Sequence, residues 1–518
     1  MNHTYCQISR LVKSIPIFLS GAIIIPSDNK LEYESDVIVV GAGPAGSAAA
    51  HYLASAGYDV IIVEKQKFPR DKVCGDFVSP VAQNELSKLG ITNLPEFKRS
   101  NKISRASVYL DGKKLISRPV PRVQGLPRYG RVVPRIVLDK LLLEAACKEG
   151  AVFLEGLKAV SMQIKRKGVE LKNEGPSGKR VLKARLLIGA DGSNSTIAKL
   201  VRGHTPSSVD RIIAMRGYFE DVEGPPNQAD LHFNKESFPG YCWLFPTGKN
   251  QANVGIGMVL DTIPSGNRLK ELLHNLIKND AALHQRLKNA KLIGQIKGWP
   301  LTTYNANQLL VYNRVMLVGD AAGLVNPLNG EGIQYALLSG RWASEVAITS
   351  ITANDFSKEA LSAYPHIVEK ELGYGMSVAS LIVQLIRNRS FNPFWLRSLE
   401  LMAERSRVDP SYADIVGGIL MGTVPQSEAT NIEVARGTIE QAMLSTGLTN
   451  LLETIQDPNA IAKATIETLQ TGFEISIQAM QNPSAFINWA IKSTTSAINL
   501  AIASSSNTSE KAEKTTSN

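Results

Sequence analysis

Two short apolar runs rich in Val and Ile stand close together near the start of the chain, at residues 36–40 and 59–64. A glycine-rich turn and a segment of small residues, mostly Ala, separate them. The β-branched runs are typical of strands, and the small-residue segment is typical of a helix packed closely on a sheet. Residues 36–65 therefore predict a strand–helix–strand unit, around which the rest of the chain is organised.

Later segments alternate between helical and strand patterns. Helical spacing is found at residues 81–89, after Arg135 up to Gly150, at 269–290, at 334–348 and at 356–385. Short strands with turns are expected at residues 152–187, and a strand-rich region from Arg211 to about Asp261. The expected fold class is α/β (α+β mixed): a Rossmann-type nucleotide domain, an inserted β-sheet domain and a helical C-terminal region.

The turn after the first strand reads Gly41-Ala-Gly43-Pro-Ala-Gly46. The first glycine allows the tight turn, the second lets the backbone approach a pyrophosphate, and the third lets the helix pack on the strand. The helix N-terminus then faces the anion, and Glu64 ends the second strand where a carboxylate can accept both ribose hydroxyls. The sequence predicts a dinucleotide site made of Gly41, Gly43, Pro44, Ala45, Gly46, Glu64 and Lys65.

Later turns supply the other parts of such a site. An apolar strand ends at Asp191-Gly192, and another ends at Gly319-Asp320, where an acid can bind a ribityl chain. The glycine-rich start of a long helix, at Gly330, Gly332 and Ile333, can face the O2 side of a flavin ring. Arg135, at the start of its helix, can meet a pyrophosphate bidentately. Together these turns indicate FAD.

Cys74 and Gly75 lie in a loop with Gly and Pro soon after the nucleotide unit. A buried apolar role and a functional role for Cys74 are equally open at this point. Tyr241, Trp243 and Phe245 alternate along a predicted strand, so one face of that strand is aromatic. We expect this face to form the wall of an apolar substrate cavity beside the flavin.

Composition narrows the class of protein. The chain has 518 residues, 44% hydrophobic and 20% charged, enough for two or three folded domains. Its four cysteines are scattered without a CxxC pair, which argues against disulfides and thiolate metal sites and fits a reducing, cytoplasmic compartment. No HExxH-type spacing occurs, so no metal is predicted.

The net charge of +10 is concentrated between residues 96 and 135, which hold eleven Lys or Arg against two acids. A solvated basic face explains this charge; a diphosphate substrate, a phosphorylated nicotinamide or an anionic membrane would explain it too. No recognition module or aromatic interleaving accompanies the charge, so nucleic acid is not an expected partner.

These motifs together resemble the FAD-dependent geranylgeranyl reductase family, within the flavoproteins built like p-hydroxybenzoate hydroxylase. The resemblance runs from about Asp36 to about Gly422. It rests on the glycine turn with Glu64, the loop Arg70-x-Lys72-x-Cys74-Gly75, Arg135 with Asp139, Asp191-Gly192, Tyr241-x-Trp243-x-Phe245-Pro246, Gly319-Asp320 and Gly330-Glu331-Gly332-Ile333. Asp76 follows Cys-Gly, a position where archaeal lipid reductases more often have a second glycine. The Cys-Gly-Asp version resembles bacterial members of the family, some of which reduce the prenyl tail of menaquinone.

The resemblance implies an enzyme that reduces isolated double bonds of a prenyl chain by hydride transfer from reduced FAD. It implies Cys74, Tyr241 and Trp243 as catalytic residues, Tyr241, Trp243 and Phe245 as the substrate wall, and Cys74 and Gly75 beside the flavin. No second GxGxxG unit is evident, so the sequence shows no dedicated nicotinamide domain. Either NADPH visits the flavin transiently, or reduced ferredoxin supplies the electrons. A prenylated small molecule or lipid is the expected substrate, and peripheral contact with a membrane stays open.

Two alternatives remain. A monooxygenase or halogenase could use the same fold, although a halogenase would be expected to carry a Trp-x-Trp-x-Ile-Pro run. Reduction of the prenyl tail of menaquinone is the other. The expected division of the chain is an N-terminal extension (1–33), an FAD-binding domain (34–350) with an interleaved substrate sheet (about 95–130 and 205–300), a closing helical region (351–423), a helical appendage (424–503) and a disordered tail (504–518).

Overall fold

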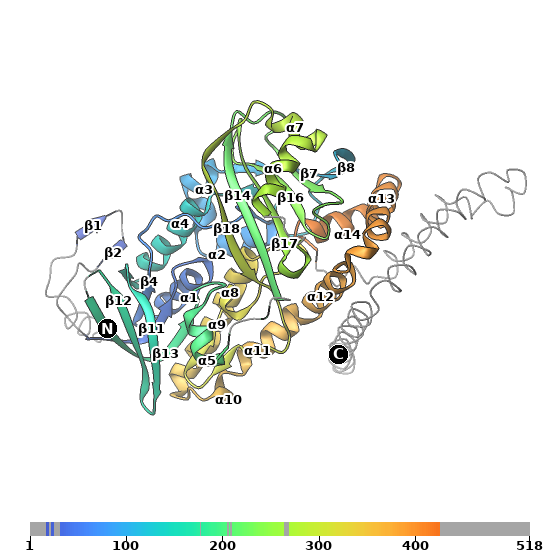
Figure 1. Ribbon diagram of the computed structural model, residues 1–518. Helices are drawn as coiled ribbons and strands as arrows, with labels where there is room; N and C mark the ends of the chain where they lie inside the picture. The colour runs from blue at the N-terminus through green and yellow to red at the C-terminus, as the bar shows by residue number, and fades with distance from the viewer. Residues whose placement is uncertain are drawn as a thin grey trace, which may run out of the picture.

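The computed structural model describes residues 17–19, 22–24, 32–176, 178–204, 207, 210–263 and 269–424. The described residues form three sheets, and helices pack on the two larger ones (Figure 1). Most of the predicted N-terminal extension, the predicted appendage after residue 424 and the predicted tail lie outside the described residues.

The first sheet has ten strands and a parallel centre. Its order is β1 (Ile17–Leu19), β2 (Ala22–Ile24), β10 (Val152–Glu155), β4 (Val60–Glu64), β3 (Glu32–Val40), β13 (Gly178–Gly189), β12 (Gly168–Gly175) and β11 (Lys158–Lys165), with β20 (Val315–Leu317) paired to β13 and β19 (Val311–Tyr312) to β20. Strands β10, β4, β3, β13 and β20 run parallel, while β11, β12 and β13 form an antiparallel extension. The carboxyl ends of the parallel strands therefore meet at one edge, where ligands of such sheets bind.

The predicted strand–helix–strand unit is confirmed as β3, α1 (Pro44–Ser55) and β4. Strand β4 is buried along its whole length, and α1 buries its small residues against β3, β4 and two further helices, α4 (Arg135–Lys148) and α9 (Ile333–Ala353). Small side chains let these helices approach closely, which is why the segment is rich in Ala. Helix α9 extends five residues beyond the predicted end at residue 348.

The second sheet has seven strands and is antiparallel except between β15 and β7. Its order is β18 (Lys291–Thr302), β14 (Arg211–Glu220), β17 (Gln251–Val259), β16 (Tyr241–Pro246), β15 (Gln228–Phe233), β7 (Arg105–Leu110) and β8 (Lys113–Pro119). The strands of a small third sheet, β5 (Phe77–Val78), β9 (Gly130–Val132) and β6 (Asn101–Ile103), flank β7 and β8 in sequence.

One face of the seven-stranded sheet is covered by two helices, α6 (Leu269–Asn279) and α7 (Ala281–Leu287). The helical segment predicted at 269–290 is present as these two helices, which are separated at Asp280. The carboxylate of Asp280 accepts the Leu283 N–H at 2.9 Å and caps a new helix. Periodicity alone does not reveal such a cap in the middle of an apolar pattern.

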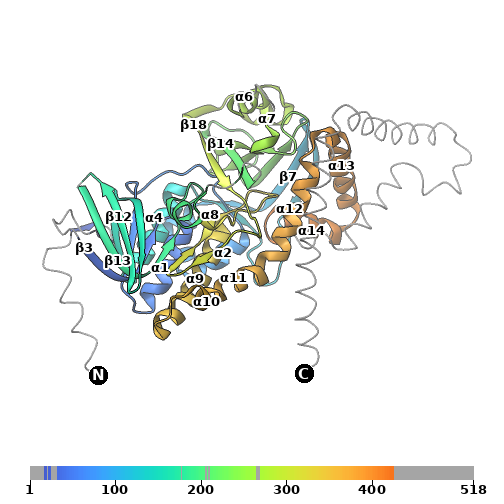
Figure 2. The same ribbon diagram turned by 60° about the horizontal axis from the view of Figure 1, so that its bottom comes forward.

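The remaining helices complete the two layers. They are α2 (Pro80–Lys88), α3 (Pro95–Arg99), α5 (Thr196–Arg202), α8 (Gly319–Ala322), α10 (Lys358–Leu361), α11 (Ala363–Val368), α12 (Tyr374–Ile386), α13 (Asn392–Val408) and α14 (Pro410–Leu420). Helices α10 to α14 run from beside α9 to beside β7 and β8, as Figures 1 and 2 show. The predicted fold class, with its Rossmann-type unit, second sheet and helical C-terminal region, is confirmed. Among the described helices, none is long and apolar enough to cross a membrane.

Candidate active site

The glycine turn between β3 and α1 forms the first part of the site. Gly41 has a φ of +107°, and a Cβ on Gly46 would lie 1.9 Å from the Gly41 carbonyl oxygen, so α1 meets the turn only because residue 46 is glycine. Pro44 is the first residue of α1, and Ala45 is buried behind it. The Glu64 carboxylate accepts N–H groups of Ala42 at 3.1 Å and Gln66 at 2.9 Å, whereas Lys65 is exposed.

A chain of buried ion pairs joins this turn to α4. Arg70 lies 2.9 Å from Asp139 and 3.7 Å from Glu64, and Arg135 donates two hydrogen bonds to Asp139 at 2.6 and 2.8 Å. A Cβ on Gly43 would lie 3.6 Å from a guanidinium nitrogen of Arg70. The guanidinium next to the glycine turn is therefore that of Arg70, and Arg135 is engaged with Asp139.

A second cation marks the other end of the site. The Lys72 ammonium lies 3.3 Å from the Asp320 carboxylate, which also accepts a hydrogen bond from the Ser193 hydroxyl at 2.9 Å. Although burial raises the pKa of Asp320, Lys72 and Ser193 hold it below its ordinary value. Gly192 borders the Lys72 ammonium, and Gly332 borders the Asp320 carboxylate, so both predicted turns converge here with Gly319.

Asp191 lies in the same turn, but its side chain points to the protein rather than to this end of the site. Its carboxylate accepts the Thr196 N–H at 2.6 Å, the Ile197 N–H at 3.2 Å and the Ser195 hydroxyl. These are the hydrogen bonds of a cap at the start of α5. The structure therefore gives Asp191 a local role in shaping the turn that presents Gly192.

The Cys74 loop lies between the two large sheets. The Cys74 sulfur accepts the Asp76 N–H at 3.3 Å, and a Cβ on Gly75 would lie 3.1 Å from the Phe245 ring and 3.5 Å from the Trp243 indole nitrogen. Burial raises the pKa of the Cys74 thiol, and the nearby Arg135 offsets part of that rise. The group present at neutral pH is thus the thiol, packed next to the aromatic strand.

The aromatic face predicted for β16 is present. The ring centroids of Tyr241 and Trp243 are 6.3 Å apart, as are those of Trp243 and Phe245. Cys242 and Leu244 point to the opposite face, where they pack with α6 and α7. The Tyr241 hydroxyl donates to the Asn329 carbonyl at 2.6 Å, so the aromatic face is tied to the loop that leads through Gly330 and Gly332 to Ile333 and α9.

A buried polar network holds the Cys74 loop, and the motifs alone did not identify it. Asn253 donates to the Cys74 carbonyl at 2.7 Å and to the Asp76 carboxylate at 2.8 Å, and it accepts the Trp243 indole N–H at 2.9 Å. The Tyr218 hydroxyl donates to the same Asp76 carboxylate at 2.5 Å. The positive φ of Asp76, 61°, marked in sequence only by the Cys-Gly-Asp run, lets the loop present its carboxylate to this network.

Arg216 fixes the first half of the same loop. Its side chain is almost fully buried, and it donates to the Asp71 carboxylate and, at 3.2 Å, to the Lys72 carbonyl. Lys297 binds Asp71 from the other side at 3.0 Å. Arg70, Lys72 and Cys74 thus face the site from one loop that the seven-stranded sheet holds in place.

These residues fit an FAD. Backbone without a Cβ atom at Gly43 faces the Arg70 guanidinium, which suits a pyrophosphate, and backbone without a Cβ atom at Gly192 faces the Lys72 ammonium at the Asp320 end. Glu64 retains acceptor capacity for ribose hydroxyls beside Ala42. The loop before Ile333 and the Cys74 loop both contact the aromatic residues of β16, where an isoalloxazine ring would be held.

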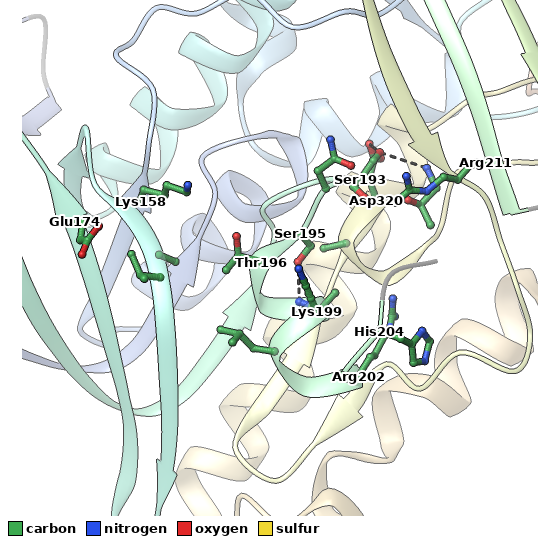
Figure 3. Close-up of a pocket in the computed structure, with 18 residues that line it drawn as sticks. Lys158, Glu174, Ser193, Ser195, Thr196, Lys199, Arg202, His204, Arg211 and Asp320 are labelled. Carbon is green, nitrogen blue, oxygen red and sulfur yellow. Dashed lines mark hydrogen bonds between the residues drawn. The ribbon is translucent and has the colours of Figure 1, made fainter. Parts of the chain in front are cut away.

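A separate cavity of about 690 Å³ opens next to Ser193 and Asp320 (Figure 3). Its labelled walls include Lys199 and Arg202 of helix α5, and Arg211 at the start of β14. Among the described residues that line it, none belongs to β16 or to the Cys74 loop. The cavity therefore adjoins the Asp320 end of the site and is distinct from the aromatic face.

Comparisons with known proteins agree with this site. The family model described as "FAD binding domain" matches residues 34–338. The chain is 33% identical over 387 residues to the menaquinone reductase of Mycolicibacterium smegmatis, covering 72% of this chain and 91% of that one. It is 32% identical over 400 residues to digeranylgeranylglycerophospholipid reductase 1 of Methanopyrus kandleri, covering 74% and 100%.

Solved structures share the fold. A geranylgeranyl bacteriochlorophyll reductase-like protein from Thermoplasma acidophilum superposes with a TM-score of 0.63 at 23% identity, covering 81% of this chain and 100% of that one. A flavin-dependent brominase superposes with a TM-score of 0.63 at 19% identity, covering 79% and 99%. At these identities the likeness concerns the fold, while the sequence relatives and the matched domain carry the family. The chain belongs to the FAD-dependent geranylgeranyl reductase family, and it is an FAD-dependent oxidoreductase.

Proposed function

We propose that this oxidoreductase saturates isolated double bonds in a prenyl chain. The observation that carries the proposal is the contact between the aromatic face of β16 and both flavin-side segments, the Cys74 loop and the Asn329–Ile333 loop. An isolated alkene has no carbonyl group to polarise or to hydrogen-bond. A site for it must therefore hold the chain by dispersion and exclude water, which is what an aromatic wall provides.

When bound and reduced, FAD supplies the hydride for such a reaction. The protein has to position the chain and provide a proton. Tyr241, Trp243 and Phe245 would hold the alkene flat, and the Tyr241–Asn329 hydrogen bond keeps that wall at a constant distance from the loop before α9. Arg70 would bind the pyrophosphate, Glu64 the ribose, and Lys72 the part of FAD that lies next to Asp320.

Cys74 has two candidate roles in this function. Its thiol, neutral because of burial, either donates a proton, directly or through water, or controls how the substrate approaches the ring. Its sulfur already accepts the Asp76 N–H, so its position is set by the loop.

Two electron donors fit the proposal, NADPH and reduced ferredoxin. Anaerobic mixing of the purified FAD-loaded protein with each donor separates them, because the correct donor bleaches the flavin absorbance and the other does not. We further propose that the protein meets its substrate at a membrane surface, since prenyl lipids reside there. Co-flotation with anionic vesicles is the expected result, and protein that remains with the soluble fraction would contradict this part.

The prenyl tail of menaquinone is a second candidate substrate. The Cys-Gly-Asp sequence of the loop favours it, as does the likeness to the menaquinone reductase of Mycolicibacterium smegmatis over 91% of that protein's length. Lipid mass spectrometry of cells lacking the protein tests both candidates. The mass increment from added hydrogen should vanish from one isoprenoid class, either quinones or lipids with other headgroups. An unchanged isoprenoid profile would argue against prenyl reduction.

A monooxygenase or halogenase on the same fold remains the alternative chemistry. The shared fold with a flavin-dependent brominase supports it, whereas the Tyr241-x-Trp243-x-Phe245-Pro run differs from the Trp-x-Trp-x-Ile-Pro run expected of a halogenase. Oxygenation would give substrate-stimulated NADPH oxidation and a hydroxylated product. Prenyl reduction proceeds without oxygen, so an anaerobic assay with product analysis discriminates the two.

A further inference from the structure

Glu331 lies at a junction of three parts of the site. It sits between Gly330 and Gly332, directly before α9. Its backbone is fixed at both ends, because its N–H donates to the Asn329 side chain at 3.0 Å and its carbonyl accepts the Asn326 N–H at 2.9 Å. The position of its carboxyl group is therefore set by the flavin-side loop.

The segment after the C-terminal helix α14 covers one side of the carboxyl group. A Cβ on Gly422, just after α14, would lie 2.2 Å from Glu331 Oε2. That position has a φ of +66°, so glycine is favoured there on conformational grounds as well. The Oε1 atom is buried and has no hydrogen-bond partner among the described residues. The C-terminal region thus packs directly on the Glu331 carboxyl group.

Glu331 differs in its charge environment from three other acids of the site, Glu64, Asp139 and Asp320. Glu64 and Asp139 lie next to Arg70, and Asp320 lies next to Lys72. Glu331 forms no ion pair with any residue in the described part of the chain. Burial raises its pKa to about 8, and the nearby Ser79 side chain offsets part of that rise. At neutral pH it is a carboxylic acid rather than a carboxylate.

The groups that face this acid belong to the reaction site. Glu331 lies close enough to Tyr241 of the aromatic strand to interact with it electrostatically, and Cys74 of the loop does so as well. Burial and these two neighbours keep Tyr241 in its neutral form. Ser79 faces Glu331 from the start of α2, and the uncharged Gly422 faces it from the C-terminal side.

We propose that Glu331 is the acid that protonates the double bond, and that Cys74 shapes the approach of the substrate. This inference rests on the prenyl reduction proposed above. The hydride from reduced FAD forms a C–H bond at one alkene carbon, the Glu331 O–H bond breaks, and its proton forms a C–H bond at the other. The alkene gains two electrons from the flavin, which is oxidised, and the carboxylate left behind takes a proton from water.

The choice of Glu331 over Cys74 follows from acidity and orientation. A general acid works best when its pKa lies near the working pH, and burial places Glu331 there while it makes the Cys74 thiol a weaker acid than usual. The Cys74 sulfur is already directed to the Asp76 N–H, whereas one oxygen of Glu331 has no partner. An unpartnered buried oxygen can turn toward a substrate without breaking an existing hydrogen bond.

The first test needs no turnover. Infrared spectra of the FAD-loaded protein without substrate should contain a carboxylic acid carbonyl band at neutral pH that disappears as the pH rises through about 8. That band should be missing from Glu331→Gln and present in the control Glu345→Gln, an exposed acid further along α9 that binds Arg341. A neutral-pH spectrum of the native protein without such a band would overturn the assignment.

The second test measures the chemical step. Protein reduced in advance is mixed anaerobically with geranylgeranyl diphosphate or menaquinone, and flavin reoxidation is followed over a single turnover. Glu331→Gln should slow it by about 10²- to 10⁴-fold, the usual effect of removing a general acid, while FAD content and flavin reduction by the donor stay as in Glu345→Gln. If both variants saturate the alkene equally fast, Glu331 is not the acid and prenyl reduction still stands. If the native protein saturates neither probe, the proposed function fails and this assignment fails with it.

Discussion

The most direct perturbation of the site is Asn253→Ala. Asn253 is fully buried and makes three hydrogen bonds, to the Cys74 carbonyl, the Asp76 carboxylate and the Trp243 indole N–H. It therefore joins the loop next to the flavin site to strands β16 and β17. Alanine removes all three hydrogen bonds and leaves their partners buried.

The expected loss can be worked out bond by bond. A hydrogen bond between neutral groups contributes about 1 kcal/mol net, and one to a charged group about 1.5–3 kcal/mol. Two neutral bonds and one to a carboxylate amount to about 4 kcal/mol of unfolding free energy, not counting the cavity. The loop should also lose its position, so turnover should fall more than FAD affinity does.

Urea unfolding followed by tryptophan fluorescence measures the unfolding free energy. Flavin fluorescence titration measures FAD affinity, for comparison with the loss of turnover. The matched control is Asn227→Ala, an exposed asparagine that donates only to the Ser104 hydroxyl at 3.0 Å, where the change should stay within about 0.5 kcal/mol. If Asn253→Ala proves as stable as Asn227→Ala, the network does not hold the loop and the reasoning is wrong.

Four further substitutions test separate features of the site. Gly43→Ala should fold, because the new Cβ lies 3.6 Å from Arg70, an ordinary contact, but it should lose FAD, because the Cβ takes up space next to the pyrophosphate site. Gly46→Ala should also destabilise the fold, because its Cβ would lie 1.9 Å from the Gly41 carbonyl oxygen. Flavin content and melting temperature separate the two variants, and equal melting temperatures would contradict the Gly46 contact. Burial raises the pKa of Asp76 to about 6 in the folded protein, above its pKa in the unfolded chain. Stability should therefore fall as the pH rises from the unfolded-state pKa to the folded-state pKa, because only the unfolded chain releases the proton in that range. Tyr218→Phe removes a hydrogen bond that lowers the pKa of Asp76, so the loss of stability should extend to higher pH. Melting temperatures measured across this pH range would record the shift. An unshifted profile would exclude a coupling between Tyr218 and the titration of Asp76. Cys74→Ala should keep FAD bound and reduce turnover, and unaltered turnover would remove the thiol from the mechanism.

The nucleotide-binding turn could be predicted from sequence because all its parts are local. Gly41, Gly46 and Glu64 lie within one strand–helix–strand unit, and hydrophobic period and glycine spacing specify that unit directly. The alternating aromatic residues of β16 are predictable for the same reason, since side chains of a strand alternate between faces. Local pattern also indicated α2, α4 and α9 to within a few residues.

Residue type alone was less informative about partners. Sequence reasoning assigned Arg135 to a pyrophosphate, which stays a prediction. It did not reveal that Asp139, four residues along the same helix, binds Arg135, or that Arg70 from a separate loop stands next to Gly43. Likewise Asp191 has the sequence position of a ligand-binding acid, yet it caps α5. A charged side chain has several partners within reach, and only the packed structure selects one of them.

The sequence by itself therefore determined the fold class, the glycine turns and the aromatic strand, since each depends on residues close together in the chain. Only the tertiary structure decided which groups surround Cys74 and Glu331. Asn253 and Tyr218 are 177 and 142 residues from Asp76, and Gly422 reaches Glu331 from the C-terminal helices. Contacts across such separations depend on how whole sheets and helices pack, which no local periodicity encodes.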